Sequence, residues 1–418
     1  MTPTAKKPKV LFFAPILEYP PAGGPQLSVV NAVKVLNRIS ELHIITTVSQ
    51  DRMGSAEAVE FFRRHCHTLI NSPTSRWVSR HRVVDKLLRR SRRLLAPAFA
   101  WFDVRCMLQH ARREGIEIFW VDRVLEHAYA VFRLLRRKRP KAAIVGDTEA
   151  VYSLFLLREL PMVKNPLRWL VIWLRGKKTQ MEEKSLVVRA DAVTAVSDID
   201  AEFFRQLGGE PGKVMRFSNV VDLEDYRDNA PPSPRIRKPC ALLLGSFGNV
   251  HSPMDRAARW LAEDIMPIVW ETVPEAHLYI IGRNSQITQA ELNGDCITVV
   301  GQVPSVLPYL QQAALTLVPL RFESGTRFKI IESGAAAVAC VSTTLGAEGL
   351  DVKHGENILI ADETDSFAAA IISVLSSPEL QQKLGSNLHN LVRQTYSLQK
   401  QTNEGERILE RLRSRCNV

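Results

Sequence analysis

The sequence has little cysteine, no long apolar run and no cluster of metal-binding residue types. Its six cysteines are scattered without a Cys-x-x-Cys pair, which argues against a disulfide framework and favours a reducing cytoplasm. No run reaches the ~18 apolar residues that a transmembrane helix needs. His65, Cys66 and His67 have no second Cys or His pair nearby to complete four ligands, so no metal site is predicted. The polar segment 1–9 leads directly into an apolar run, unlike a signal peptide.

Length and charge are those of a basic, globular protein with two domains. The 418 residues suffice for two cores of about 200 residues each. Hydrophobic residues make up 45% and charged residues 24%, both ordinary values for a globular protein. The net charge of +11 predicts an acidic partner, which is a nucleotide, an anionic membrane surface or a nucleic acid.

Strand-like and helix-like patterns alternate along the first half, which predicts a parallel, doubly wound sheet. Strands are expected at 10–15 and 42–47, joined through a glycine loop and a helix at 26–36. Gly23 and Gly24 in that loop either bring backbone amides to a phosphate or simply form a turn. Further strands are expected at 116–121, 142–145 and 192–196, and in the second half at 240–245, 277–283, 297–304 and 315–320.

The segment 315–332 has the pattern of an anion-binding turn. An apolar strand leads to the turn Ser324-Gly325-Thr326, where glycine lets the backbone approach a ligand closely. The free N–H groups and the dipole of the following helix favour an anion. A strand, a glycine turn and a helix are also ordinary α/β architecture, so both interpretations stay open at this point.

Three charged residues on that helix suggest which anion binds. Arg327 can contact two phosphate oxygens, and Lys329 adds a compact positive charge. Glu332, about one turn further on, can accept hydrogen bonds from a vicinal diol such as a ribose. Diphosphate and ribose together describe a nucleotide.

The order of residues in this segment resembles the donor-binding segment of family 4 glycosyltransferases. In the bacterial sugar transferases of that family it has the form Gly-Thr-Arg-x-Lys-x-x-Glu followed by Ser-Thr-Thr-x-Gly-x-Glu-Gly-Leu, which residues 325–332 and 342–350 match. The resemblance implies an α/β GT-B fold, in which two Rossmann-like domains face each other across a cleft and the C-terminal helix crosses back to the N-terminal domain. The expected parts are an acceptor-side domain at 1–215, a nucleotide-sugar-binding domain at 216–395 and the crossover helix at 396–418.

The resemblance also implies an activity. It predicts a retaining, metal-independent hexosyltransferase that uses a UDP- or GDP-sugar as substrate and needs no cofactor. The acceptor is a glycan or a lipid-linked molecule in bacterial cell-surface polysaccharide or glycoconjugate synthesis. Two alternatives stay open, a nucleotide-sugar epimerase and a nonenzymatic membrane-surface protein with a degenerate GT-B site.

Individual positions take roles from the same resemblance. Glu323 and Asp147 are the catalytic candidates, although Glu323 is one place from where the family's Glu-x7-Glu pattern puts its first Glu, and helix capping competes as a role for Asp147. Glu149 is the acceptor-side candidate. The segment 333–341 departs from the family pattern by lacking its later Gly and its Pro. The donor-binding candidates are Gly24, Ser324, Gly325, Thr326, Arg327, Lys329, Glu332, Arg283 and Val303.

Asp198 and Asp200 form an Asp-x-Asp pair of the kind that holds a metal–nucleotide complex in other glycosyltransferases. Ser197 precedes the pair with the spacing of a capping box, so a structural role at a helix start is predicted instead.

Two basic segments with interleaved apolar residues lie at 76–93 and 168–178. Basic segments that carry Trp suit an anionic membrane surface, whereas a solvated helix face and a nucleic-acid patch are the alternatives. No nucleic-acid motif accompanies them, so no nucleic-acid partner is predicted. The expected location is the cytoplasm, peripheral on the inner face of the membrane.

Overall fold

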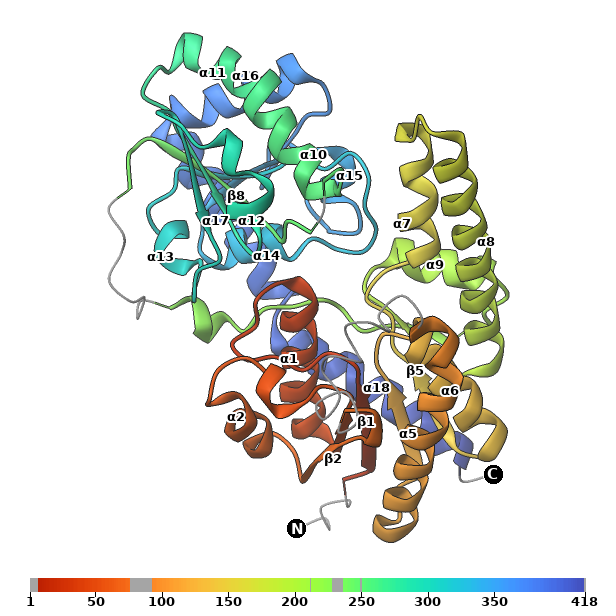
Figure 1. Cartoon of the computed structure of the whole chain (residues 1–418). Helices are drawn as coiled ribbons and strands as arrows, with labels where there is room; N and C mark the ends of the chain where they lie inside the picture. The colour runs from red at the N-terminus through yellow and green to blue at the C-terminus, as the bar shows by residue number, and fades with distance from the viewer. Residues whose placement is uncertain (1–6, 76–91, 211, 228–235, 249, 417–418) are drawn as a thin grey trace, which may run out of the picture. The chain divides into compact units, whose positions relative to one another are not determined.

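The computed structural model describes residues 7–75, 92–210, 212–227, 236–248 and 250–416. These residues form two compact units (Figure 1). The first comprises 1–21, 25–218 and 401–418, and the second comprises 22–24 and 219–400. The basic segment predicted at 76–93 lies outside the described residues up to 91.

The first unit is built on a seven-stranded parallel sheet with the order β3-β2-β1-β4-β5-β6-β7. Its central strands are almost wholly buried, as continuous apolar runs covered on both faces should be. The strands are β1 (Lys9–Ala14), β2 (Glu41–Thr46), β3 (Thr68–Asn71), β4 (Ile118–Val121), β5 (Ala143–Gly146), β6 (Ala192–Ala195) and β7 (Val214–Arg216).

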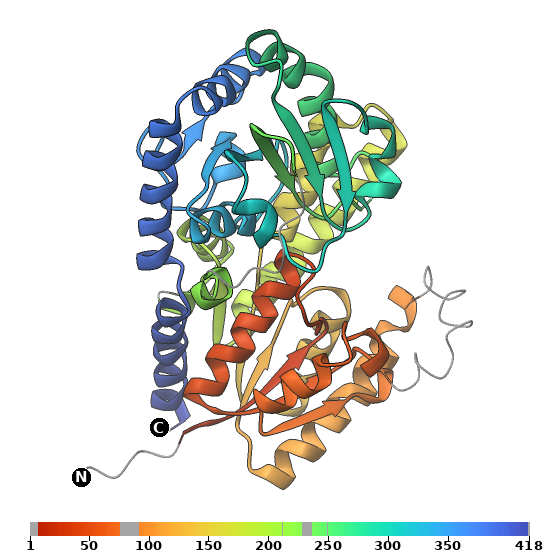
Figure 2. The same cartoon turned by 90° about the vertical axis from the view of Figure 1, so that its left-hand side faces the viewer.

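Helices cover both faces of this sheet. One core joins the strands to α5, α6 and the ends of α8 and α9, while α18 lies along α1 (Figure 2). The helices are α1 (Gly24–Ile39), α2 (Ala58–Arg64), α5 (Arg92–Glu114), α6 (Glu126–Lys138), α7 (Tyr152–Glu159), α8 (Pro166–Arg189), α9 (Asp198–Gln206) and α18 (Leu398–Cys416).

The final helix, α18, is held to the first unit by buried hydrogen bonds. Glu404 accepts from the backbone N–H of Ser218 at 2.8 Å and from its hydroxyl at 3.0 Å. Gln401 donates to the carbonyl of Ser218 at 2.8 Å. The helix α18, which follows the second unit in the sequence, therefore completes the first unit.

Helices α7 and α8 form an antiparallel pair (Figure 1). Asn165 caps α8 by accepting from the N–H groups of Leu167 and Arg168, both at 3.0 Å. Glu183 of α8 accepts from the backbone N–H of Ser153 at 3.0 Å and from its hydroxyl, which fixes the start of α7. Burial raises the pKa of Glu183 to about 7 against these hydrogen bonds.

The second unit contains a six-stranded parallel sheet with the order β10-β9-β8-β11-β12-β13. This strand order, like that of the first unit, leaves a switch point where successive connections turn to opposite sides. The strands are β8 (Cys240–Leu244), β9 (His277–Ile281), β10 (Ile297–Gly301), β11 (Leu315–Val318), β12 (Ala339–Ser342) and β13 (Leu359–Ile360).

Helices pack on both faces of the second sheet as well. A large core lies between the sheet and α10, α11, α16 and α17, and a smaller one covers the other face. The helices are α10 (Pro253–Arg259), α11 (Met266–Thr272), α12 (Ser285–Thr288), α13 (Leu307–Leu310), α14 (Phe328–Ala335), α15 (Thr344–Ala347), α16 (Thr364–Leu375) and α17 (Pro378–Thr395), with a π-helical turn at Trp260–Ile265 after α10.

The predicted α/β fold with two parallel sheets is confirmed. All the strands expected from the sequence are present, with offsets of at most three residues at each end. The short strands β3, β7, β12 and β13 were not predicted. Within the described residues, no helix combines the length and the apolar content needed to cross a membrane.

Candidate active site

Several predicted donor-binding residues of the second unit follow the carboxyl ends of parallel strands in one sheet. Arg283 comes after β9, Val303 after β10, and the segment 323–327 after β11. The carboxyl ends of parallel strands meet at one edge of a sheet, where open α/β folds bind their ligands. The structure therefore brings these predicted residues to a single edge.

The turn after β11 has the conformation that the sequence predicts. Gly325 has a φ of +81°, in the left-handed region that favours glycine. Ser324 and Thr326 are buried beside it. Asn219 donates from Nδ2 to the Thr326 hydroxyl at 2.9 Å, which ties the turn to the start of the second unit.

Arg327 occupies the cap position of α14, one residue before the helix begins. It is only 4% exposed, and its Nη2 donates to the carbonyl of Leu345 at 3.2 Å. The Thr343 hydroxyl donates to the carbonyl of Leu320 at 2.5 Å and accepts from the N–H of Gly346 at 2.9 Å. These hydrogen bonds of Thr343 hold the turn before α15 against the loop that carries Arg327.

Lys329, in the first turn of α14, has a desolvated ammonium group. Its Nζ lies 2.9 Å from the thioether sulfur of Met254, a weak acceptor. Burial lowers the pKa of Lys329 to about 8, with Arg327 acting in the same direction and the carboxylates of Glu323 and Glu332 opposing. A cation in this setting is stabilised if an anion binds beside it.

Glu332 faces a tyrosine that no sequence pattern singles out. Its Oε1 accepts from the Tyr226 hydroxyl at 2.9 Å across 106 positions of sequence. Burial raises the pKa of Glu332, and the hydrogen bond from Tyr226 and the charge of Lys329 oppose that rise. Tyr226 therefore orients the carboxylate that is predicted to bind the ribose.

A close approach of two strand ends shapes the same edge. Gly282, after β9, has a φ of +143°, and a Cβ there would lie 1.7 Å from the carbonyl oxygen of Gly245. Neither chirality nor space allows a side chain at this point. Arg283 follows this glycine, and its carbonyl accepts from the N–H of Phe247 at 2.9 Å.

In the first unit, Asp147 follows β5 and is buried in a hydrogen-bonded setting. It accepts at 2.6 Å from the indole N–H of Trp120, at the other oxygen from the hydroxyl of Thr194, and is 7% exposed. Burial raises its pKa, and the hydrogen bonds from Thr194 and Trp120 oppose that rise. The competing prediction that Asp147 caps a helix is wrong, because α7 begins after Val151 without a side-chain cap.

Glu149 belongs to a buried group of charges beside Asp147. Arg123 forms an ion pair with Glu149, and the Tyr152 hydroxyl donates to Glu149 at 2.7 Å. Arg123 has a φ of +48°, a left-handed conformation uncommon outside glycine. Burial raises the pKa of the neighbouring Asp122 to about 7, although Arg123 counteracts this. Asp122, Arg123 and Tyr152 were not predicted, since only the fold brings them to Glu149.

Two remaining predictions concern the first unit and its boundary. Ser197 caps α9 by accepting from the N–H of Asp200 at 3.1 Å, which confirms the structural role of that segment. Gly24 is the first residue of α1 and is grouped with the second unit.

Among the residues that the structure describes, no group of His, Cys, Asp or Glu is arranged to hold a metal ion.

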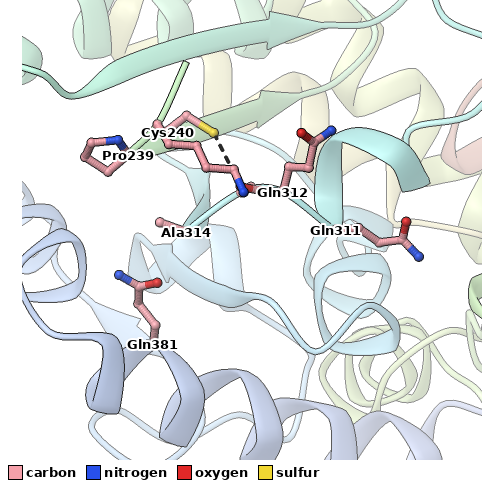
Figure 3. Close-up of a pocket in the computed structure, with 8 residues that line it drawn as sticks. Pro239, Cys240, Gln311, Gln312, Ala314 and Gln381 are labelled. Atoms are coloured by element: carbon pink, nitrogen blue, oxygen red, sulfur yellow. Dashed lines mark hydrogen bonds between the residues drawn. The ribbon is translucent and has the colours of Figure 1, made fainter. Parts of the chain in front are cut away.

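A hollow of about 520 Å³ lies at the opposite, amino-terminal edge of the second sheet (Figure 3). Its amide side chains are engaged locally, since Gln312 donates to the carbonyl of Pro308 at 2.9 Å and Gln381 to that of Val374 at 2.8 Å. The predicted donor-binding residues do not line it. We assign this hollow no part in the chemistry.

Comparison with known proteins finds a family model that matches part of the second unit. Residues 241–377 match the family model described as Glycosyl transferases group 1. This stretch contains β8 to α16, and with them Arg327, Lys329 and Glu332.

One curated relative matches part of the chain. It is an uncharacterized 44.6 kDa protein in the cps region of Klebsiella pneumoniae, 22% identical over 163 residues. The match covers 37% of this chain and 42% of that protein, so it spans about two fifths of the relative's length.

Solved structures share the fold over nearly the whole chain. Sucrose-phosphate synthase from Thermosynechococcus elongatus has a TM-score of 0.70 at 17% identity, covering 98% of this chain and all of that one. HepE from Anabaena, solved with UDP-glucose, has a TM-score of 0.63 at 13% identity over 97% and 99%. A putative UDP-N-acetylglucosamine 2-epimerase from Listeria monocytogenes has a TM-score of 0.55 at 12% identity over 95% and 94%. The shared fold confirms the expected GT-B fold, and residues 241–377 are similar to the group 1 glycosyl transferases.

Proposed function

We propose that this protein is a retaining, metal-independent glycosyltransferase that moves a hexose from a UDP- or GDP-sugar to a glycan or lipid-linked acceptor of the bacterial cell surface. The reaction is placed on the cytoplasmic side of the membrane. The HepE structure was solved with UDP-glucose, and the curated relative lies in a cps region, which supports a nucleotide sugar and a polysaccharide role.

The observation that carries the proposal is the pair of cations at the start of α14, of which Arg327 is buried and Lys329 is half-buried. Arg327 and Lys329 lie within three positions of the left-handed Gly325 turn, at the sheet edge where α/β folds bind ligands. Departure of a nucleoside diphosphate leaves negative charge on its phosphates. Fixed donors in a desolvated site stabilise such charge without reorganising at the moment of reaction.

The neighbouring carboxylates receive the other roles. Glu332, oriented by Tyr226, accepts hydrogen bonds from the ribose diol. The charge of Glu323 raises the pKa of Lys329, and its carboxylate accepts at 3.4 Å from the N–H of Ser324. We assign Glu323 the role of contacting the donor sugar. In the first unit, Asp147 and Glu149 are assigned to catalysis and to the acceptor side.

A thermal-shift screen over UDP, GDP and their sugars tests the donor class. We expect stabilisation by one nucleotide series in the wild type and its loss in R327A. Absence of any shift with either series, in a folded protein, would contradict the proposal.

A nucleotide-sugar epimerase is the second candidate, because the Listeria protein with this fold carries that title. Incubation with the donor alone separates the two activities. An epimerase converts or releases the sugar without an acceptor, whereas a transferase turns over appreciably only when the acceptor is added.

A further inference from the structure

Between Leu167 and Met181, α8 presents apolar side chains to solvent on the side opposite its packed face. Ile172 and Gly176 are the buried positions of this part of the helix, and the Gly176 Cα sits against Leu157 of α7. Half a turn away runs a stripe at spacings of three, four and seven residues, which places its members on one face. We call it the α8 stripe, and it consists of Leu167, Leu170, Leu174 and Met181, which are 75%, 47%, 53% and 66% exposed.

Two partly exposed tryptophans lie on the other side of the helix from the α8 stripe. Trp169 and Trp173 precede the buried Gly176 by seven and three residues, which places them beside the face that packs against α7. Their rings stack with centroids 6.4 Å apart and are 40% and 36% exposed. Exposed apolar residues gathered on one face, as in the α8 stripe, mark an interaction site rather than ordinary surface. Burial in the core does not explain the stripe, because the face that packs against α7 is the opposite one.

The charges around the α8 stripe indicate which kind of partner it binds. Residues 160–181 contain five cations and no Asp or Glu, the cations being Lys164, Arg168, Arg175, Lys177 and Lys178. Glu159 and Glu182 flank the segment and pair with Arg168 at 2.7 Å and Lys178 at 3.6 Å, which leaves cations in excess. Cores of protein–protein interfaces are depleted of lysine, whereas anionic bilayers attract basic helices with Trp and Leu on their apolar face.

We propose that α8 binds the surface of an anionic lipid bilayer, with the α8 stripe among the acyl chains and Lys177 and Lys178 at the headgroups. The helix lies in the plane of the membrane and does not cross it. This inference goes beyond the proposed function, since it concerns a helix remote in sequence from the donor residues and is measured without a sugar nucleotide.

Sedimentation of the full chain with vesicles tests the proposal. We expect binding to vesicles that contain phosphatidylglycerol, little binding to phosphatidylcholine alone, and a loss of binding as salt is raised. L170Q/L174Q should weaken the partition coefficient by about tenfold or more, because it removes two inserting side chains. Glutamine keeps the helix propensity close to that of leucine, so the fold of α8 should persist.

The cationic part has its own variant. K177Q/K178Q should weaken binding to phosphatidylglycerol vesicles by roughly tenfold and leave binding to phosphatidylcholine unchanged. The matched control is K353Q/K383Q, which removes two exposed lysines of the second unit, one of them paired with a glutamate as Lys178 is. I287Q is the apolar control, since Ile287 is 79% exposed outside α8.

Three results would overturn the proposal. The first is a wild type that does not sediment with phosphatidylglycerol vesicles at low salt. The second is an L170Q/L174Q variant that binds like the wild type. The third is concentration-dependent self-association without vesicle binding, lost in L170Q/L174Q, which would make the stripe an interface between copies. Circular dichroism and nucleotide binding of each variant report folding separately, so these results do not depend on the proposed function.

Discussion

Replacing Lys329 by methionine should stabilise the protein while removing its ability to bind a nucleotide. The ammonium lies beside a thioether instead of a carboxylate, and burial brings its pKa from the ordinary 10.5 to about 8. Each unit of pKa corresponds to about 1.4 kcal/mol, so the protonated lysine lowers the free energy of unfolding by about 3 kcal/mol at most. Methionine fits the same apolar surroundings without the charge.

The pH dependence identifies Lys329 as the source of this effect. Because the pKa is lower in the folded state, the unfolded chain holds the proton more tightly. The cost is fully present below pH 8, falls as pH rises from about 8 to about 10.5, and is absent above that window. The advantage of K329M over the wild type should therefore be largest at pH 7 and shrink by pH 10.

Urea denaturation of both proteins at pH 7 and pH 10 measures the change. The difference between the two pH values cancels the intrinsic contribution of methionine, and K353M, at an exposed lysine, serves as the control. A stability difference that is the same at both pH values would refute the desolvated ammonium. Nucleotide affinity should fall above pH 8 in the wild type, be about a hundredfold weaker in K329M, and persist across this range in K329R.

Three further variants test the rest of the structure. R327A should lower turnover by roughly a hundredfold at saturating donor in a steady-state assay, because a fixed charge at the leaving diphosphate is lost, and a near-wild-type rate would exclude that role. Y226F should raise the donor KM by about fivefold, the value of one hydrogen bond orienting Glu332, and an unchanged KM in the same assay would show that Tyr226 does not support the ribose contact. E404A should lower the free energy of unfolding by about 2 kcal/mol in urea by leaving the buried N–H and hydroxyl of Ser218 without their acceptor, and equal stability would mean that water replaces the carboxylate.

The local structure of the segment 315–332 was predictable from the sequence because its signals are local. A strand, a left-handed glycine and a run of charged residues occur within twenty positions, and the structure places Gly325, Arg327 and Lys329 accordingly. Tyr226 could not be found in this way, because its contact with Glu332 spans 106 positions and no pattern marks it. Arg123 escaped notice for the same reason, since its left-handed backbone and its pairing with Glu149 arise from tertiary packing.

The short strands show a second limit of sequence reasoning. β7 has three residues and β13 has two, so neither is long enough to display an alternating pattern. β12 was not predicted as a strand, and the turn after it was recognised only because residues 342–350 resemble the family segment. The structural role of this turn appears in the hydrogen bonds of Thr343. Long apolar runs can thus be predicted as strands from the sequence alone. Short edge strands, and residues such as Tyr226 that position other side chains, depend on tertiary neighbours that the sequence does not reveal.

The attachment of α18 to Ser218 has a consequence for biosynthesis. The N-terminal part of a chain emerges from the ribosome first, and domains generally fold in the order in which they emerge. Here the helix that completes the first unit is made after the second unit, so β7 and Ser218 remain without Glu404 during the synthesis of the entire second unit. The nascent first unit must keep that surface uncovered until α18 emerges, which makes this the stage at which a chaperone would be needed most.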